Sequence, residues 1–328
     1  MHALTLTIML MACTGEPRED AGGDSGAVSD AIDLRRDFPD PPASDADMLI
    51  FEPPAYTIPA FGEKQFCWFG TYEGPEVGIV YNAMYQAPSG HHVVMLTTTA
   101  DPDVYPDDEV FDCTEQDALP MTDMDPNFIG SGELVETDAG PQGEFWLPDG
   151  MGAVMKPGTR YVIQSHYVNY EPEDILVNDR MVYGVLPAER IETWAAPVIN
   201  VKSDMTIPPG QEHSMSFECE FEDDYNILFL GGHMHEYGTR FSIDHIKGDG
   251  TEETLYDIPV WDPYMRDAPP FNRYLDAPLE LEAGDRWRTN CTWFNTEDHE
   301  LAFPSEMCVT FGMAYPARVT ITCDASDD

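Results

Sequence analysis

The sequence predicts an all-β protein made of two tandem antiparallel β-sandwich domains of a jelly-roll-like kind. Short strand-like runs recur between turns rich in Gly, Pro and Asp, and no long segment has the periodicity of an amphipathic helix. Residues 48–328 are enough for two domains of about 140 residues each, an ordinary domain size. We therefore place an N-terminal domain at residues 48–190 and a C-terminal domain at residues 191–328.

The first domain contains four clear strand segments. They are short, rich in β-branched and aromatic residues, and bounded by turn residues: 78–81, 92–96, 161–168 and 180–186. The segment 92–96 follows the turn Pro88-Ser89-Gly90 and continues as a fully apolar run. Such a run is typical of a strand buried on both faces.

The second domain shows stricter alternation of apolar and polar residues. Its strand-like segments are 215–221, 225–230, 241–243, 279–281, 286–293 and 309–311. The tetrapeptide Glu282-Ala283-Gly284-Asp285 predicts a tight turn after the fourth of them. The boundary between the domains falls within residues 188–209, and the turn Pro208-Pro209-Gly210 introduces the next strands.

The N-terminal residues predict export. Residues 1–13 resemble a bacterial lipoprotein signal that ends at the lipid-accepting Cys13, and the apolar stretch 3–11 is too short to cross a bilayer. An ordinary cleaved signal peptide is the alternative. Residues 14–47 are rich in Gly, Ser, Asp and Pro and predict a flexible acidic linker. We expect a periplasmic or cell-surface protein with a lipid anchor.

The charge balance excludes some partners. With 61 acidic and 16 basic residues, the formal net charge is −45. Such a surface repels nucleic acid and anionic lipid, so membrane attachment is expected only through acyl chains on Cys13. The acidity is interpreted as a general surface adaptation, as in salty water, rather than as a means of attracting a cationic substrate or copper.

His233-Met234-His235 is the first candidate metal site. Residues two apart on a strand point to the same face, so both imidazoles can bind one ion. Met307 could add a thioether, a soft ligand that favours Cu(I). Without that thioether, a His-x-His pair is common by chance, and a single methionine is usually a filler of core gaps.

A second cluster contains His91, His92 and His166. Adjacent residues on a regular strand face opposite sides, so His91 and His92 can share a metal only if the chain bends at the Ser89-Gly90 turn. Three neutral imidazoles suit copper or zinc. The remaining histidines at positions 2, 213, 245 and 299 are left unassigned, because a lone histidine is usually structural.

These motifs resemble the copper type II, ascorbate-dependent monooxygenases, the family of dopamine beta-monooxygenase and peptidylglycine alpha-hydroxylating monooxygenase. The matching elements are Gly90-His91-His92, Gln164-Ser165-His166-Tyr167, Gly232-His233-Met234-His235, Glu306-Met307-Cys308 and the stretch 291–301. Their order and approximate spacing agree with the family over residues 49–323. The stretch 291–301 is closest to the dopamine beta-monooxygenase branch.

The resemblance implies two copper ions that cycle between Cu(I) and Cu(II). His91, His92 and His166 would bind an electron-transfer copper in the N-terminal domain. His233, His235 and Met307 would bind the oxygen-activating copper in the C-terminal domain. Substrate, dioxygen and ascorbate or another one-electron donor would be the partners. Because ascorbate is an anion, the acidic surface makes it a less favourable donor.

The chain has seven cysteines, and six remain if Cys13 is lipidated. In an oxidising compartment three disulfides are expected, but the sequence alone allows 15 pairings. The resemblance implies Cys67–Cys113, Cys219–Cys323 and Cys291–Cys308.

The sequence limits the class of substrate but does not identify the compound. In the peptidylglycine branch, an Asn and a Tyr follow the ligand Met and an Arg precedes the His-x-His. Here Val309 and Phe311 occupy the first two positions and Leu230-Gly231-Gly232 supplies no Arg. This disfavours peptide amidation and favours hydroxylation of a small amine or aromatic compound. A copper-binding or copper-storage lipoprotein and a structural surface adhesin are the alternatives.

Overall fold

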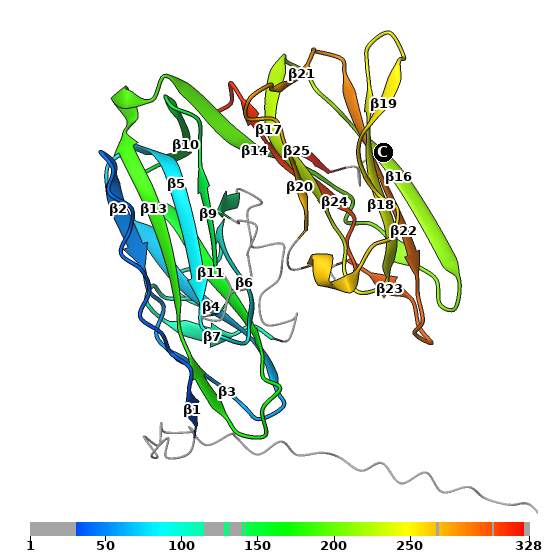
Figure 1. Cartoon of the computed structure of the whole chain (residues 1–328). Coiled ribbons are helices and arrows are strands. Elements are labelled where there is room, and N and C mark those ends of the chain that lie inside the picture. Colours follow the sequence, from blue (N-terminus) through cyan, green and yellow to red (C-terminus); the bar gives the residue numbers. More distant parts are fainter. Residues whose placement is uncertain are drawn as a thin grey trace, which may run out of the picture. The chain divides into compact units, whose positions relative to one another are not determined.

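The computed structural model describes residues 31–114, 128–130, 140, 142–266, 269–303 and 305–324 (Figure 1). Nearly all regular structure in these ranges is strand, and the helical elements are the short 3-10 turns η2 (Ala188–Arg190) and η3 (Pro263–Arg266). The predicted all-β class is confirmed. No helix among the described residues is long and apolar enough to cross a membrane.

The first sandwich consists of two main sheets. One contains β2 (Asp47–Phe51), β13 (Asp179–Pro187), β5 (Val77–Gln86) and β10 (Met151–Met155), with β9 (Gln142–Trp146) also paired to β5. The other contains β7 (Val110–Asp112), β4 (Glu63–Tyr72), β11 (Thr159–Val168), β6 (Gly90–Thr97) and β8 (Phe128–Gly130). A small third sheet contains β1 (Ile32–Asp33), β12 (Ile175–Val177) and β3 (Tyr56–Ile58).

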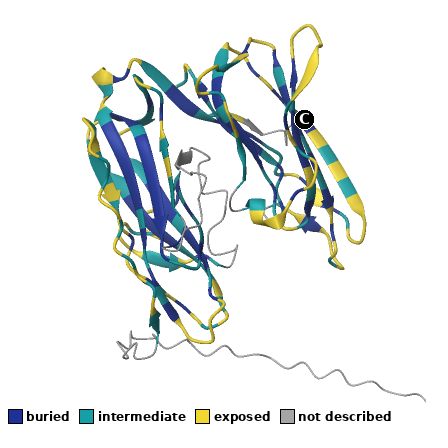
Figure 2. Ribbon diagram, viewed as in Figure 1, coloured by how far each residue is buried: buried dark blue, intermediate teal, exposed yellow. Residues whose placement is uncertain are grey.

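Apolar side chains from both main sheets form the core of this sandwich. Met84 and Met181 come from β5 and β13, and Met95 and Ile163 come from β6 and β11. All four are at most 1% exposed. Figure 2 shows the long buried stretches of β5 and β13. The sequence segments that form these strands are continuously apolar because the strands are buried.

The second sandwich has the same two-layer plan. One layer contains β14 (Thr193–Val201), β24 (Val309–Tyr315), β17 (Tyr225–His233) and β20 (Phe271–Arg273), with β21 (Leu279–Leu281) on β17 and β25 (Ile321–Asp324) on β14. The other contains β16 (Glu212–Glu220), β22 (Arg286–Phe294), β18 (Gly238–Ile246) and β19 (Glu252–Ile258). The short strands β15 (Thr206–Ile207) and β23 (Leu301–Ala302) pair separately. Trp287, Trp293, Phe241, Ile227 and Leu230 fill the core between the layers.

One sheet continues through both sandwiches. Strand β10 pairs in parallel with β14, and the other edge of β14 pairs antiparallel with β24. Most other pairs are antiparallel, as predicted. Because β14 begins just after η2, the predicted boundary at residue 190 lies where the chain enters this shared strand.

Residues 31–47 correct part of the predicted linker. Ile32–Asp33 pairs with β12, the Leu34 amide donates to the carbonyl of Leu176 at 2.9 Å, and the Phe38 ring lies 5.8 Å from that of Tyr85. These apolar side chains contact the first sandwich, and the polar average composition of the segment concealed them. The predicted signal at residues 1–13 and linker residues 14–30 lie outside the described residues.

Candidate metal centres

A β-bulge positions the first histidine cluster. In the β6–β11 pair, His92 is opposite His166 while Gly90 is opposite Tyr167, so His91 is an extra residue on β6. Ser89, at the preceding turn, has a positive φ of 74°. A bulge changes the direction of successive side chains, and it supplies the bend that two adjacent histidines need.

The three imidazoles lie close together. The ring centroid of His166 is 5.1 Å from that of His91 and 5.0 Å from that of His92. Two imidazoles bound to one metal, each with a metal–nitrogen distance of about 2.0–2.1 Å, have centroids about 5 Å apart at a tetrahedral angle. The spacing of the rings in this cluster is therefore that of imidazoles sharing one ion.

Glu63 fixes the orientation of the His166 ring. Its Oε1 lies 2.7 Å from Nε2 of His166, whose side chain is fully buried. An ionised carboxylate only accepts hydrogen bonds, so Nε2 carries the proton and Nδ1 keeps the lone pair. A histidine ligand usually donates its second N–H to such an acceptor.

A buried polar group lies on the opposite face of β11. Ser165 and Tyr167 flank His166 in sequence, and the Tyr167 hydroxyl donates to the carboxylate of Asp179. Burial raises the pKa of Asp179 to about 6, and the hydrogen bond from Tyr167 acts in the opposite direction. This polar group anchors the strand that carries His166.

The second cluster lies where β17 ends beside β24. His233 is the last residue of β17 and pairs with Val309, the first residue of β24, so His235 and Met307 each lie two residues beyond this last pair. The Nε2 atoms of His233 and His235 are 3.1 Å apart. Two nitrogens bound to one metal at about 2.0–2.1 Å each are separated by about 3 Å at an angle near 100°.

Each polar group of His235 has a partner. Its Nδ1 lies 3.0 Å from the Ser305 carbonyl, which can only accept, so Nδ1 carries the proton and the lone pair is on Nε2. Its own carbonyl accepts from the indole Nε1 of Trp261 at 3.1 Å. Nε2 of His233 can donate to His235 in the absence of metal, and an ion can take the place of that proton.

The rim of this cluster is acidic. Tyr237 follows His235 by two residues, and its hydroxyl donates to Glu297. This hydrogen bond, with burial as the next cause, raises the pKa of Tyr237 to about 12, so its hydroxyl stays protonated at neutral pH. Glu236, beside His235, forms an ion pair with Arg266.

The donor atoms are not converged on a metal position. Within the described ranges, no group of three or more His, Cys, Asp and Glu side chains is arranged so that it could hold a metal ion. The His233 cluster supplies only two such side chains, because its third predicted ligand is a thioether. The other cluster has three rings at suitable centroid distances, and rotation of the imidazoles would be needed to aim their nitrogens at one point. Imidazole and thioether are ligand types that copper accepts, and the two copper sites stay a prediction.

Two of the three expected disulfides are present. Cys67 pairs with Cys113, and Cys291 pairs with Cys308, immediately after Met307. Cys219 is also disulfide-bonded. The side chain of its predicted partner, Cys323, lies outside the described residues.

Sequence reasoning missed two carboxylates, Glu63 and Glu306. Glu63 is 103 residues from His166 and reaches it only through the pairing of β4 with β11. Nothing in the sequence alone signals that contact. Glu306 is adjacent to Met307, and this position beside a predicted ligand is the signal for it in the sequence.

The unassigned histidines have other surroundings. His245 is buried, with Nε2 at 2.8 Å from Asp285 and Nδ1 at 3.4 Å from Glu253. His213 stacks on Trp293, and His299 is exposed. Their contacts give them structural or surface roles, and His2 lies outside the described residues.

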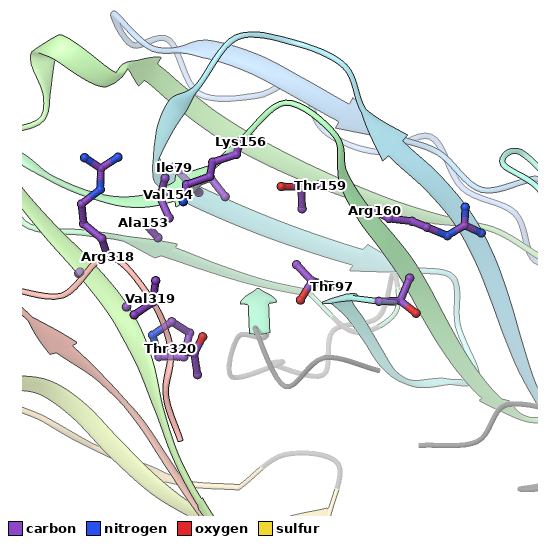
Figure 3. Close-up of a pocket in the computed structure, with 14 residues that line it drawn as sticks. Ile79, Thr97, Ala153, Val154, Lys156, Thr159, Arg160, Arg318, Val319 and Thr320 are labelled. Carbon is purple, nitrogen blue, oxygen red and sulfur yellow. The ribbon is translucent and has the colours of Figure 1, made fainter. Parts of the chain in front are cut away.

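A cavity of about 290 Å³ lies in the described part of the chain, apart from both histidine clusters (Figure 3). Lys156, Arg160 and Arg318 contribute cationic groups to its lining. Asp107 pairs with Arg160 at 3.1 Å, and Glu76 pairs with Arg318 at 2.5 Å. None of the six predicted metal ligands lines this cavity.

No protein-family model and no curated protein matches this chain. Among solved structures, the chain is similar to the major capsid protein P2 from bacteriophage PM2, with 9% identity, a TM-score of 0.32, and coverage of 82% of this chain and 98% of that chain. It is also similar to the VP2 subviral particle of infectious bursal disease virus, with 10% identity, a TM-score of 0.21, and coverage of 85% and 74%. Likenesses at these TM-scores carry no argument about the function of this chain.

Proposed function

We propose that this protein is a two-copper monooxygenase that hydroxylates a C–H bond of a small organic substrate with dioxygen and a one-electron donor. The observation that carries the proposal is the facing pair of imidazoles at His233 and His235, with Nε2 atoms 3.1 Å apart beside the Met307 segment. Copper bound at the two sites would supply one-electron chemistry with dioxygen. Two reducing electrons and two protons balance the products, which are one alcohol and one water.

The residues of the chain have separate tasks in this proposal. His233, His235 and Met307 would hold the oxygen-activating copper, with the Ser305 carbonyl fixing the tautomer of His235. His91, His92 and His166 would hold the electron-transfer copper, with Glu63 fixing the tautomer of His166. Both supporting contacts leave one nitrogen of the ligand histidine as a lone-pair donor.

The substrate is proposed to be a small amine or aromatic compound. Val309 and Phe311 lie on β24 opposite His233 and Gly231 of β17, where the peptidylglycine branch of the resembling family has polar residues. A peptide carboxylate would find no cationic partner from these two side chains. Glu297, which accepts from the Tyr237 hydroxyl, would also repel it.

The proposal is tested by loading the purified protein with copper and supplying ascorbate, dioxygen and a panel of amines, phenols and hydrophobic amides. We expect oxygen consumption matched by hydroxylated product. Met307→Ala should lower the hydroxylation rate by at least about 100-fold, since even residues that only support a ligand contribute about 10–100-fold. Copper should remain at His91, His92 and His166.

Met313→Ala provides a matched control, because Met313 lies on the same strand β24 and is a partly buried methionine that packs against the cluster of Leu147, Ala195 and Leu228. It should retain both coppers and the activity. Activity that survives in Met307→Ala would show that the oxygen site is wrongly assigned. Copper uptake without hydroxylation of any substrate would favour the alternative, a copper-binding or copper-storage lipoprotein.

A further inference from the structure

Glu306 is a buried carboxylate between the two segments that carry the proposed oxygen site. Its side chain is fully buried, and it immediately precedes Met307. Charged side chains are almost never fully buried unless they are paired or hydrogen-bonded. The contacts of Glu306 therefore indicate its role in the structure.

Four N–H groups converge on this carboxylate. Oε2 accepts from the backbone amide of His235 at 3.1 Å, from the indole Nε1 of Trp293 at 3.0 Å and from the amide of Met307 at 3.3 Å. Oε1 accepts from the amide of Tyr237 at 2.8 Å. One side chain thus holds the backbone at a proposed histidine ligand and at the proposed methionine ligand.

These contacts suit the ionised form of Glu306. All four partners are donors, and a protonated carboxyl would place an O–H group against an N–H group. Hydrogen bonds to an ionised acceptor are also stronger than neutral ones.

We propose that Glu306 is a positioning residue that fixes the His233–His235 segment and Met307 in one arrangement before copper binds. The inference rests on the proposed function, since it takes those three residues as ligands. Without the carboxylate, the Ser305–His235 contact would still link the two segments near the site, and the Cys291–Cys308 disulfide would join the Met307 segment to β22. Neither of these holds the amides of His235 and Met307 to a common acceptor.

Asp285 offers a matched control in the same sandwich. It is also a buried carboxylate, and it accepts from the amides of Gly248 at 2.9 Å and Glu282 at 3.0 Å and from Nε2 of His245 at 2.8 Å. Its partners are not proposed ligands. A general effect of losing a buried carboxylate should therefore appear equally in both variants.

The experiment compares Glu306→Gln with Asp285→Asn in the full chain. Glutamine keeps the shape but turns an amide NH₂ toward N–H donors. In the metal-free protein, we expect faster hydrogen exchange at the amides of His235, Tyr237 and Met307 in Glu306→Gln alone. In the copper-loaded protein, Cu(I) affinity at the His233, His235 and Met307 site should fall by about 10–100-fold, the usual effect of removing an outer support. X-ray absorption should show loss of the sulfur ligand.

Asp285→Asn should retain wild-type exchange at those three amides and wild-type sulfur ligation. Trp293→Phe removes one donor to Glu306 and keeps an aromatic ring in the core. It should also speed hydrogen exchange at the three amides, by less than Glu306→Gln, and it replaces that variant if Glu306→Gln does not fold. The inference would be wrong, and the proposed function unaffected, if the Glu306 variant kept wild-type hydrogen exchange and sulfur ligation. The same conclusion would follow if the Asp285 variant showed equally fast exchange and an equal loss of sulfur ligation. A wild-type protein that takes up no copper would overturn the proposed function, and the inference with it.

Discussion

His166 is buried within β11, and the carboxylate of Glu63 accepts a hydrogen bond from its Nε2 at 2.7 Å. Glu63 itself is about half exposed, with 54% of its side chain accessible. As a stability contribution this contact is modest, because an exposed partner is screened by solvent. The contact matters because it fixes the tautomer of His166, and Nδ1 is then the nitrogen that can bind a metal.

We predict that Glu63→Ala weakens copper binding at the His91, His92 and His166 cluster by about 10–100-fold. Glu63→Gln should weaken it less, because the amide oxygen can still accept from Nε2. A competition titration with a copper chelator measures both affinities. Glu52→Gln, an exposed carboxylate of the same sandwich paired with Arg180, should have no effect. Equal affinity in Glu63→Ala and the wild type would show that His166 does not need this acceptor.

Glycines next to the His-x-His motif act through packing between strands β17 and β18. A Cβ placed on Gly232 would lie 2.1 Å from Cε1 of Phe241, and that ring is fully buried. A Cβ on the neighbouring Gly231 would meet its nearest atom at 3.2 Å. Adjacent positions on one strand therefore have very different tolerance for a side chain.

We predict that Gly232→Ala lowers the free energy of unfolding by about 1–3 kcal/mol, the usual cost of forcing extra atoms into a filled core. Gly231→Ala should cost clearly less. Urea denaturation of the two metal-free variants gives the comparison. Similar losses for both would mean that the Phe241 ring can move away and that His233 is not held by this close approach.

Much of the element pattern could be predicted from alternation and turn residues. Residues 279–281 were expected as a strand before a tight turn, and β21 has those bounds with a positive φ at Gly284 in the turn. The long-range pairings could not be predicted in this way. The parallel β10–β14 pair and the reach of Glu63 to His166 depend on strand order, which local periodicity does not encode.

The candidate sites show the same division. The residue types in the two histidine clusters were visible in the sequence, and the need for a bend at His91 followed from strand geometry. That the bend is a β-bulge depends on the register of β6 against β11. The positions of Ile32, Leu34 and Phe38 were missed because average composition hides a few apolar residues in an otherwise polar segment.

The charge of the whole molecule should govern its reaction with a soluble donor. A net charge of −45 repels an anion such as ascorbate, and the repulsion weakens as the Debye length falls from about 30 Å at 0.01 M salt to about 8 Å at 0.15 M. We predict that the second-order rate of reduction by ascorbate rises with ionic strength. Stopped-flow reduction of the copper-loaded protein measures it. A cationic donor, hexaammineruthenium(II), should show the opposite trend, and a salt-independent ascorbate rate would place the acidic surface away from the entry site of the donor.

The central claim is that the two histidine clusters are copper sites. Anomalous diffraction at the copper edge, from crystals of copper-loaded protein, tests it most directly. We predict two copper peaks per chain, one bound by His91, His92 and His166 and one bound by His233, His235 and Met307. A map with no copper at these clusters, or with copper bound only elsewhere, would contradict the account.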